Sequence, residues 1–186
     1  MNFRDFLHSI MLIGAMAGGL ILLALVNEHL LWATEVTAGV HWIYLPAGLR
    51  MCFVLLLPLQ GTLAIFLGSL YMASRDPSLD AGLVCVNAAV TAAGPILALL
   101  VARHWMGLHA NLDNLSARRL LSLAIVFGSF STTLHQAFFA ALGRQPAFMS
   151  MWVGDTVGCL LCLYIFKGLF HAWQRRACPV RHATKV

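Results

Sequence analysis

Long apolar runs separated by short polar stretches fill almost the whole sequence, and most of them are long enough to span a membrane as a helix. The run Pro46–Ala73 differs, because Arg50 lies near its start and Pro58 and Gly61 interrupt its middle. Proline and glycine favour breaks in helices, so this run predicts either one kinked helix or two short ones. The predicted spans are Ile10–Leu31, Pro46–Ala73 as one or two helices, Asp80–Ala102, Arg118–Leu142 and Ala147–Phe170.

The positions of lysine and arginine favour two short helices over one. Six spans place both termini in the cytoplasm, with nine Lys and Arg residues inside, two outside and Arg50 in the membrane. Five spans would place the loop with Glu28 and Glu35 inside without any Lys or Arg. Cytoplasmic loops are rich in basic residues, so the pattern favours six spans, with a short broken helix pair that turns near Pro58–Gly61. The inner residues would be Arg4, Arg103, Arg118, Arg119, Lys167, Arg175, Arg176, Arg181 and Lys185, and the outer ones Arg75 and Arg144.

Composition supports a polytopic membrane protein that is all-α. Of 186 residues, 60% are hydrophobic and only 10% are charged, whereas soluble domains are about one-quarter charged. The mean hydropathy is +0.82. We expect one integral membrane domain over residues 1–186, with short cytoplasmic tails at 1–9 and 174–186. The net charge of +5 then reflects the topology of the protein in the membrane. We expect the lipid bilayer as a partner and no nucleic acid.

Polar positions at helix ends mark the expected boundaries. We interpret Asn27-Glu28-His29 as the interfacial end of the first span, and Ser116 or Asn114 as the N-cap of the fifth. The small residues Gly14 and Gly18 form a G-x-x-x-G pair that allows another helix to approach closely.

Four polar side chains, one from each of four predicted helices, fall about 10–12 Å below the outer surface at about 1.5 Å per residue, and two more lie close to the same level. They are Arg50, Asn87, Thr91, His135, Gln136 and Asp155. A charge inside a membrane needs a partner, so we predict that Arg50 pairs with Asp155. His135 and Asn87 would complete the hydrogen bonding.

This polar layer has two interpretations. Open to the outside, it could hold a small polar ligand or report pH through His135. Alternatively, it is a structural lock, a buried ion pair that fixes helix register and binds nothing. The helical periodicity does not decide between them.

The remaining candidates for chemistry are weaker. Cys159-x-x-Cys162 suggests a metal or redox pair, but its apolar surroundings favour simple packing. We find no His pair with zinc-protease spacing, no nucleophile–base set, no phosphate loop and no paired carboxylates. We therefore expect no metal, no cofactor and no enzymatic activity.

Three motifs, in order along the chain, resemble membrane-associated sensor domains of the MASE type. The first runs from Trp42 through Pro46 and Gly48, the second is Ile65–Leu70 around Gly68, and the third is Met151–Gly158 with Trp152, Gly154, Asp155 and Gly158. Asn87 falls where that family has an asparagine. The resemblance covers about Trp42 to Leu163.

The resemblance implies a sensor, in a free-standing and shortened form. Members of the family usually precede histidine kinase, PAS or diguanylate cyclase modules. We therefore expect a multi-pass protein of the bacterial inner membrane that binds a small ligand or a membrane partner and signals to a separate protein. The alternative is the substrate-binding membrane subunit of a vitamin-type importer, or a small permease, because such subunits also have six helices and a short broken pair.

Overall fold

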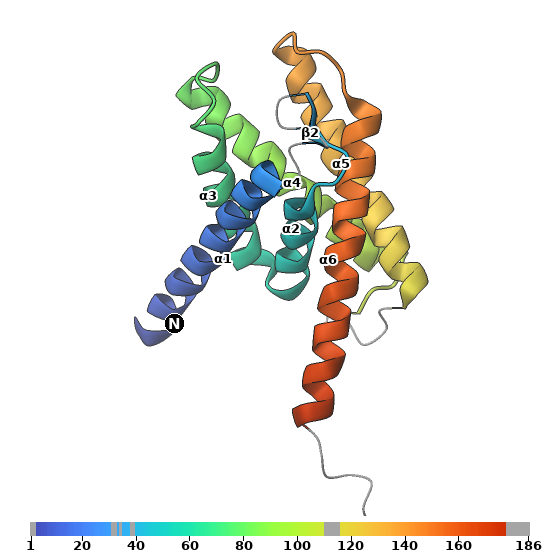
Figure 1. The fold of residues 1–186 in the computed structure, drawn as a ribbon. Helices are drawn as coiled ribbons and strands as arrows, with labels where there is room; N and C mark the ends of the chain where they lie inside the picture. The colour runs from blue at the N-terminus through green and yellow to red at the C-terminus, as the bar shows by residue number, and fades with distance from the viewer. Residues whose placement is uncertain (1–2, 31–32, 34, 38–39, 110–115, 178–186) are drawn as a thin grey trace, which may run out of the picture.

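The computed structural model describes residues 3–30, 33, 35–37, 40–109 and 116–177. In this part of the chain, six helices form a bundle and two short strands form an antiparallel pair (Figure 1). The elements are α1 (Phe3–Leu30), β1 (Glu35–Thr37), β2 (Val40–His41), α2 (Leu45–Leu56), α3 (Pro58–Ala73), α4 (Ala81–Trp105), α5 (Ala117–Ala141) and α6 (Phe148–Ala177). The predicted all-α membrane bundle, including its broken helix pair, is confirmed.

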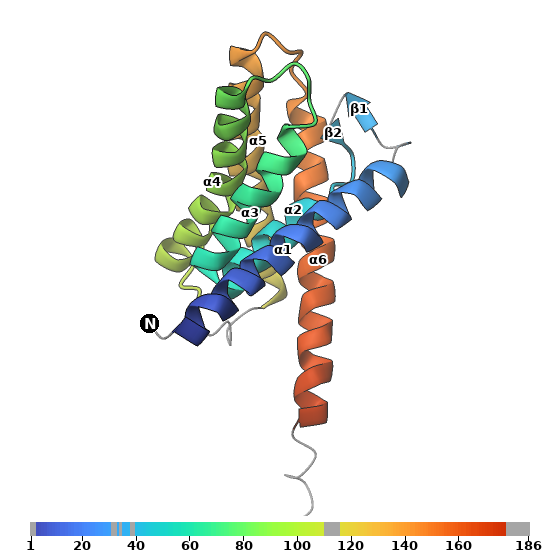
Figure 2. The same cartoon turned by 90° about the vertical axis from the view of Figure 1, so that its left-hand side faces the viewer.

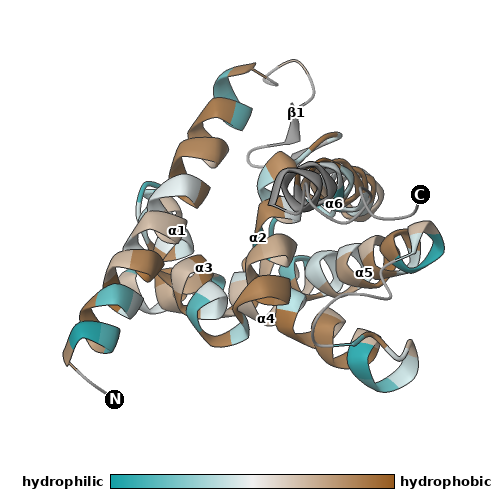
Figure 3. Cartoon of the chain, turned by 90° about the horizontal axis from the view of Figure 1, so that it is seen from below, coloured by the Kyte–Doolittle hydropathy of each residue, from teal (hydrophilic) through white to brown (hydrophobic). Residues whose placement is uncertain are grey.

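Four of the described helices, α1, α4, α5 and α6, are long and apolar enough to cross a membrane. Helices α2 and α3 have 12 and 16 residues, fewer than the about 20 that a spanning helix needs. Figure 3 shows the bundle from below, with mostly hydrophobic helices and hydrophilic residues concentrated near their ends. Length and composition together indicate a membrane location.

The helices alternate in direction along the chain. In Figures 1 and 2, α1, α3 and α5 rise, while α2, α4 and α6 descend. The start of α1 and the end of α6 therefore lie at the same end of the bundle, which we call the lower end. The α3–α4 and α5–α6 loops lie at the opposite, upper end.

The break between α2 and α3 falls at Leu57, directly before Pro58. Proline suits the first position of a helix, because its missing N–H would have no partner in the helix there. Gly61 is inside α3 and lets that helix begin close against α2, since a Cβ at this position would come within 2.6 Å of the Phe53 carbonyl. The predicted turn is therefore confirmed, with only Pro58 at the break.

Helix α2 begins inside the bundle instead of at its surface. Tyr44 precedes the helix without capping it through its side chain, and its backbone amide donates to the Gly154 carbonyl at 3.2 Å. The next amide, that of Leu45, donates to Asn27 Oδ1 at 3.1 Å. Helix α1 ends at Leu30, as expected from Asn27-Glu28-His29, but Asn27 itself is only 1% exposed. Its side chain provides the acceptor for the Leu45 amide, which has no partner within α2.

The contact between α2 and α6 is close, because glycines lie on both helices. We call it the α2–α6 seam and define it by Tyr44, Gly48, Gly154, Gly158 and Cys162. A Cβ at Gly158 would overlap the Tyr44 carbonyl, and one at Gly48 would overlap Cys162 and the Gly158 carbonyl. The Cys162 thiol donates to the Leu45 carbonyl at 3.4 Å, in line with the packing interpretation of this cysteine.

Several helix ends differ from the predicted ones. Helix α1 begins at Phe3 instead of Ile10, and α6 continues to Ala177 instead of ending at Phe170. The helical backbone continues past both apolar stretches, because its internal hydrogen bonds do not require apolar side chains. Ser116 is the N-cap of α5, and its hydroxyl accepts from the Arg119 amide at 3.3 Å. Asn114, Arg181 and Lys185 lie outside the described residues.

Candidate functional site

A cavity of about 280 Å³ lies among the helices, and all six contribute to its wall. Its polar residues include Tyr44, Arg50, Ser69, His135 and Asp155. Apolar side chains from α1, α3, α5 and α6 complete the wall, and residues of both upper loops reach it. Small-ligand sites have this mixture of apolar surface and a few polar groups.

Five of the six residues of the predicted polar layer line this cavity. They are Arg50, Asn87, Thr91, His135 and Asp155. The side chain of Gln136 turns instead toward the start of α6, where it accepts from the Ala147 amide at 3.2 Å and donates to Met151 Sδ at 3.6 Å. Adjacent residues on a helix point about 100° apart, so Gln136 projects in a different direction from His135.

Arg50 binds an aromatic side chain, and not the predicted carboxylate. Its Nη2 donates to the Tyr44 hydroxyl at 3.0 Å, and its guanidinium carbon lies 5.2 Å from the centre of the same ring. Its Nε is buried and has no hydrogen bond partner. No Arg50 nitrogen lies within 4.0 Å of a carboxylate oxygen of Asp155, so the predicted direct ion pair is not formed.

Asp155 is buried on α6, with 2% of its surface exposed. Ser131 and Arg50 are near enough to act on its carboxylate. The second carboxylate oxygen, Oδ2, is buried without a partner. The two charges therefore line one cavity without forming a direct ion pair.

His135 connects α5 to α4 through both ring nitrogens. Nδ1 lies 2.9 Å from the Ser131 carbonyl, and Nε2 lies 3.1 Å from Thr91 Oγ1. A carbonyl only accepts, so Nδ1 carries a proton and the neutral ring accepts from Thr91 at Nε2. The Thr91 hydroxyl also lies 2.8 Å from the Asn87 carbonyl, to which it donates when Nε2 carries a proton of its own. The direction of the Thr91 hydroxyl thus follows the protonation of His135.

Sequence reasoning missed four residues of this region, namely Asn27, Tyr44, Ser69 and Ser131. Ser131 precedes His135 by one helical turn, and that spacing could have placed it on the same face. Ser69 lies within the second resemblance motif, Ile65–Leu70, and its hydroxyl is buried without a partner. No pattern in the sequence could have placed Tyr44 over Arg50, because that contact depends on where α2 begins.

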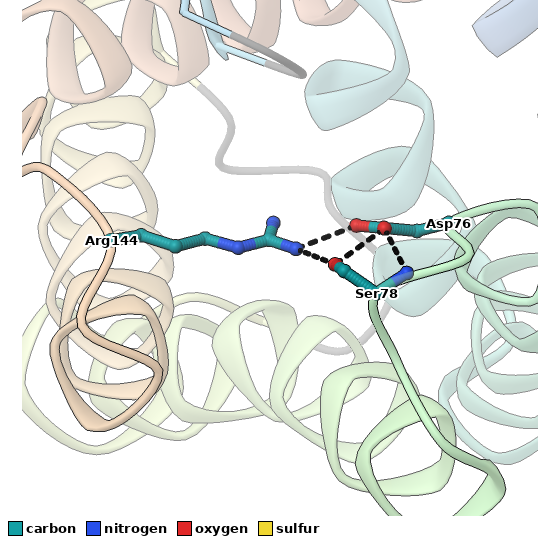
Figure 4. Close-up of polar contacts among 3 residues, drawn as sticks. All are labelled: Asp76, Ser78 and Arg144. Carbon is teal, nitrogen blue, oxygen red and sulfur yellow. Dashed lines mark hydrogen bonds and ion pairs between the residues drawn. The ribbon is translucent and has the colours of Figure 1, made fainter.

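Charged residues join the two upper loops beside the cavity (Figure 4). Arg144 of the α5–α6 loop reaches across to the α3–α4 loop, where its Nη2 donates to Asp76 at 2.7 Å and to Ser78 Oγ at 2.6 Å. The hydrogen bonds from Ser78 and Arg144 lower the pKa of Asp76 to about 2. Arg75 and Glu28 form a second, exposed ion pair at 3.4 Å.

The resemblance motifs occupy two places in the fold. The first and third meet in the α2–α6 seam, since Gly48 packs against the Gly158 carbonyl. Within the second motif, Gly68 packs against α1, where a Cβ would lie 3.2 Å from Leu20. Trp152 donates its indole N–H to Ser129 at 3.1 Å, while Trp42 is 48% exposed.

No protein-family model, no characterised protein and no solved structure matches this chain. The described residues also hold no group of three or more His, Cys, Asp or Glu that could bind a metal ion.

Proposed function

We propose that this protein is a sensor-type membrane protein that binds a small polar ligand in the cavity and signals to a separate protein. The observation that carries the proposal is the meeting of Arg50, Asn87, Thr91, His135 and Asp155 at one cavity. The resemblance to MASE-type domains supports the sensor role. The proposal assigns no chemical step to the cavity.

The proposed orientation follows from the basic residues. Arg103, Arg118 and Arg119 flank the α4–α5 connection at the lower end, whereas Arg75 and Arg144 lie in the upper loops. The positive-inside rule then makes the lower end cytoplasmic and the upper end external. The cavity would receive its ligand from outside, in a protein that crosses the bacterial inner membrane with six segments.

Unsatisfied polar atoms support a binding site over a structural lock. Buried polar groups in native proteins nearly always have hydrogen bond partners, and each exception needs an explanation. Here Arg50 Nε, Ser69 Oγ and Asp155 Oδ2 are all buried without partners in residues that line the cavity. A structural lock would be expected to join the two charges directly. A ligand would supply the missing partners.

Helix α6 offers a route for the signal. It carries Asp155 at the cavity and runs to Ala177 at the lower end. The α2–α6 seam couples it to the helix that carries Arg50. A ligand that binds both residues would move α2 and α6 together relative to the other helices, and a cytoplasmic partner could detect that movement.

A thermal-shift screen of small polar compounds on the purified protein in detergent tests the proposal. We expect a compound that raises the melting temperature of the wild type but not of Ser69→Leu, which fills the cavity. The matched control is Ser122→Leu, an exposed position on α5 that should retain the shift. If no compound acts on the wild type, or if Ser69→Leu responds equally, the cavity is not the binding site.

A transport assay separates the sensor from its alternatives. Broken helices like the α2–α3 pair also occur in transporters, where they form substrate sites. The sensor proposal predicts that liposomes containing the protein bind the active compound without accumulating it. Accumulation by the protein alone would indicate a permease, and accumulation that requires an energising subunit would indicate an importer.

A further inference from the structure

Two opposite charges face the same cavity without neutralising each other directly. Arg50 and Asp155 are 9% and 2% exposed, and each keeps one buried polar atom without a partner. The other charged residues at the cavity, Glu28, Asp76 and Arg144, all have ion-pair partners at the upper loops. Among the described residues that line the cavity, only Arg50 and Asp155 are charged without an ion pair.

We propose that the ligand is a small zwitterion, with an anionic group that binds Arg50 and an ammonium group that binds Asp155. This inference rests on the proposed ligand-binding function and specifies its chemistry. The guanidinium is suited to a carboxylate or phosphate, because its N–H groups form paired hydrogen bonds with such anions. Asp155 Oδ2 is a free acceptor for an ammonium donor.

Ligands with a single charge fit this cavity less well. An anion at Arg50 would lie near the carboxylate of Asp155, and a cation at Asp155 would lie near the guanidinium. Like charges in such proximity oppose binding, most strongly where water is scarce. A neutral ligand would leave both charges without a counter-charge. A zwitterion gives each of them an opposite partner.

The cavity wall limits the size of the zwitterion. At about 280 Å³, the cavity lies near the lower limit for small-molecule sites. Leu20, Ala24, Met72 and Phe138 supply apolar wall beside the polar groups, so a short aliphatic segment would be accommodated. A free amino acid has this chemistry, and so does the headgroup of phosphatidylethanolamine.

A series of amino acids with increasing charge separation provides the test, measured by calorimetry on the full chain in detergent. The series is glycine, β-alanine, γ-aminobutyrate and δ-aminovalerate, each compared with the carboxylate and the amine of equal length. We expect one member to bind about 10- to 100-fold more tightly than its singly charged counterparts, the range of one lost charge-assisted hydrogen bond. Addition of phosphatidylethanolamine or phosphatidylcholine to the micelles distinguishes a lipid headgroup from a free amino acid. A response to phosphatidylethanolamine alone would identify the lipid.

Variants identify which residue binds which end. Arg50→Gln should remove the advantage of the zwitterion over the amine, and Asp155→Asn should remove its advantage over the carboxylate. If these variants do not fold, Arg50→Lys and Asp155→Glu keep the charges, and Asp155→Glu should shift the preference to a shorter ligand. Carboxylate or neutral compounds that bind the wild type as tightly as any zwitterion would overturn this inference but not the ligand-binding function. Failure of every compound, charged or neutral, would overturn both.

Discussion

The α2–α6 seam and the cavity lie next to each other but are packed in opposite ways. In the seam, glycines bring the two backbones together so closely that an added Cβ at Gly48 or Gly158 would overlap its neighbours. In the cavity, side chains from all six helices leave about 280 Å³ unfilled and several polar atoms without partners. Buried interiors are normally close-packed and satisfied, so the cavity is the exception that needs explaining.

The difference shows how the two charges are held apart. Arg50 follows Gly48 by two residues on α2, and Asp155 directly follows Gly154 on α6. The backbone segments that carry both charges are therefore fixed relative to each other by the seam. Rigid positioning of this kind is what a binding site requires of its polar groups.

The largest effect should come from a substitution that breaks the seam. Gly158→Ala would place a methyl group against the Tyr44 carbonyl, which is backbone and cannot move aside as a side chain would. We expect a loss of about 1–3 kcal/mol or more in the free energy of unfolding, measured by thermal or denaturant melts in detergent. The control Gly168→Ala makes the same change on the same helix, where no atom lies within 4 Å. If the two variants melt alike, the seam is not closely packed.

A smaller effect is expected at the buried start of α2. Asn27→Ala removes the acceptor of the Leu45 amide and should cost about 1–2 kcal/mol, because a capping interaction is lost. Asn87→Ala is the matched control, because Asn87 is only partly buried and lies on the cavity wall. Comparable melting temperatures for the two variants would show that Asn27 does not support the α2 start.

The smallest effect should come from the ion pair between the upper loops. Asp76 and Arg144 are both 34% exposed, so Arg144→Gln should cost no more than about 1 kcal/mol at neutral pH. The pKa of Asp76 is lowered from 3.8 to about 2, so its contribution to stability is complete above about pH 3.8 and is lost as the pH falls through 2. The difference in melting temperature between wild type and variant should therefore shrink over that range. A difference in melting temperature that grows on acidification would contradict the lowered pKa of Asp76.

The sequence was sufficient for the parts of the fold that depend on local patterns. Apolar length predicted the long helices, and the basic residues together with Pro58 predicted the broken pair. The common depth of the polar residues predicted five that meet at the cavity. These inferences succeed because helix geometry converts residue spacing directly into depth.

The sequence was insufficient where partners depend on packing. Arg50 binds Tyr44 and not Asp155, and Tyr44 itself is positioned by its backbone bond to Gly154 on a distant helix. Gln136 turns away to the start of α6, since its direction is set by helix rotation, which depth does not reveal. Asn27 lies at the expected end of α1, but its hydrogen bond to the Leu45 amide was not predicted. Each difference reflects a tertiary contact that no local pattern encodes.

The measurement that tests the account most directly is the melting temperature of the double variant Arg50→Gln/Asp155→Asn, with and without the zwitterion that binds the wild type. If the charges belong to a binding site, the uncharged double variant should melt at or above the wild-type temperature without ligand, because two poorly satisfied buried charges are removed. It should also lose the ligand-induced shift. A double variant that melts several degrees below the wild type and still responds to the ligand would show that the two residues form a structural lock.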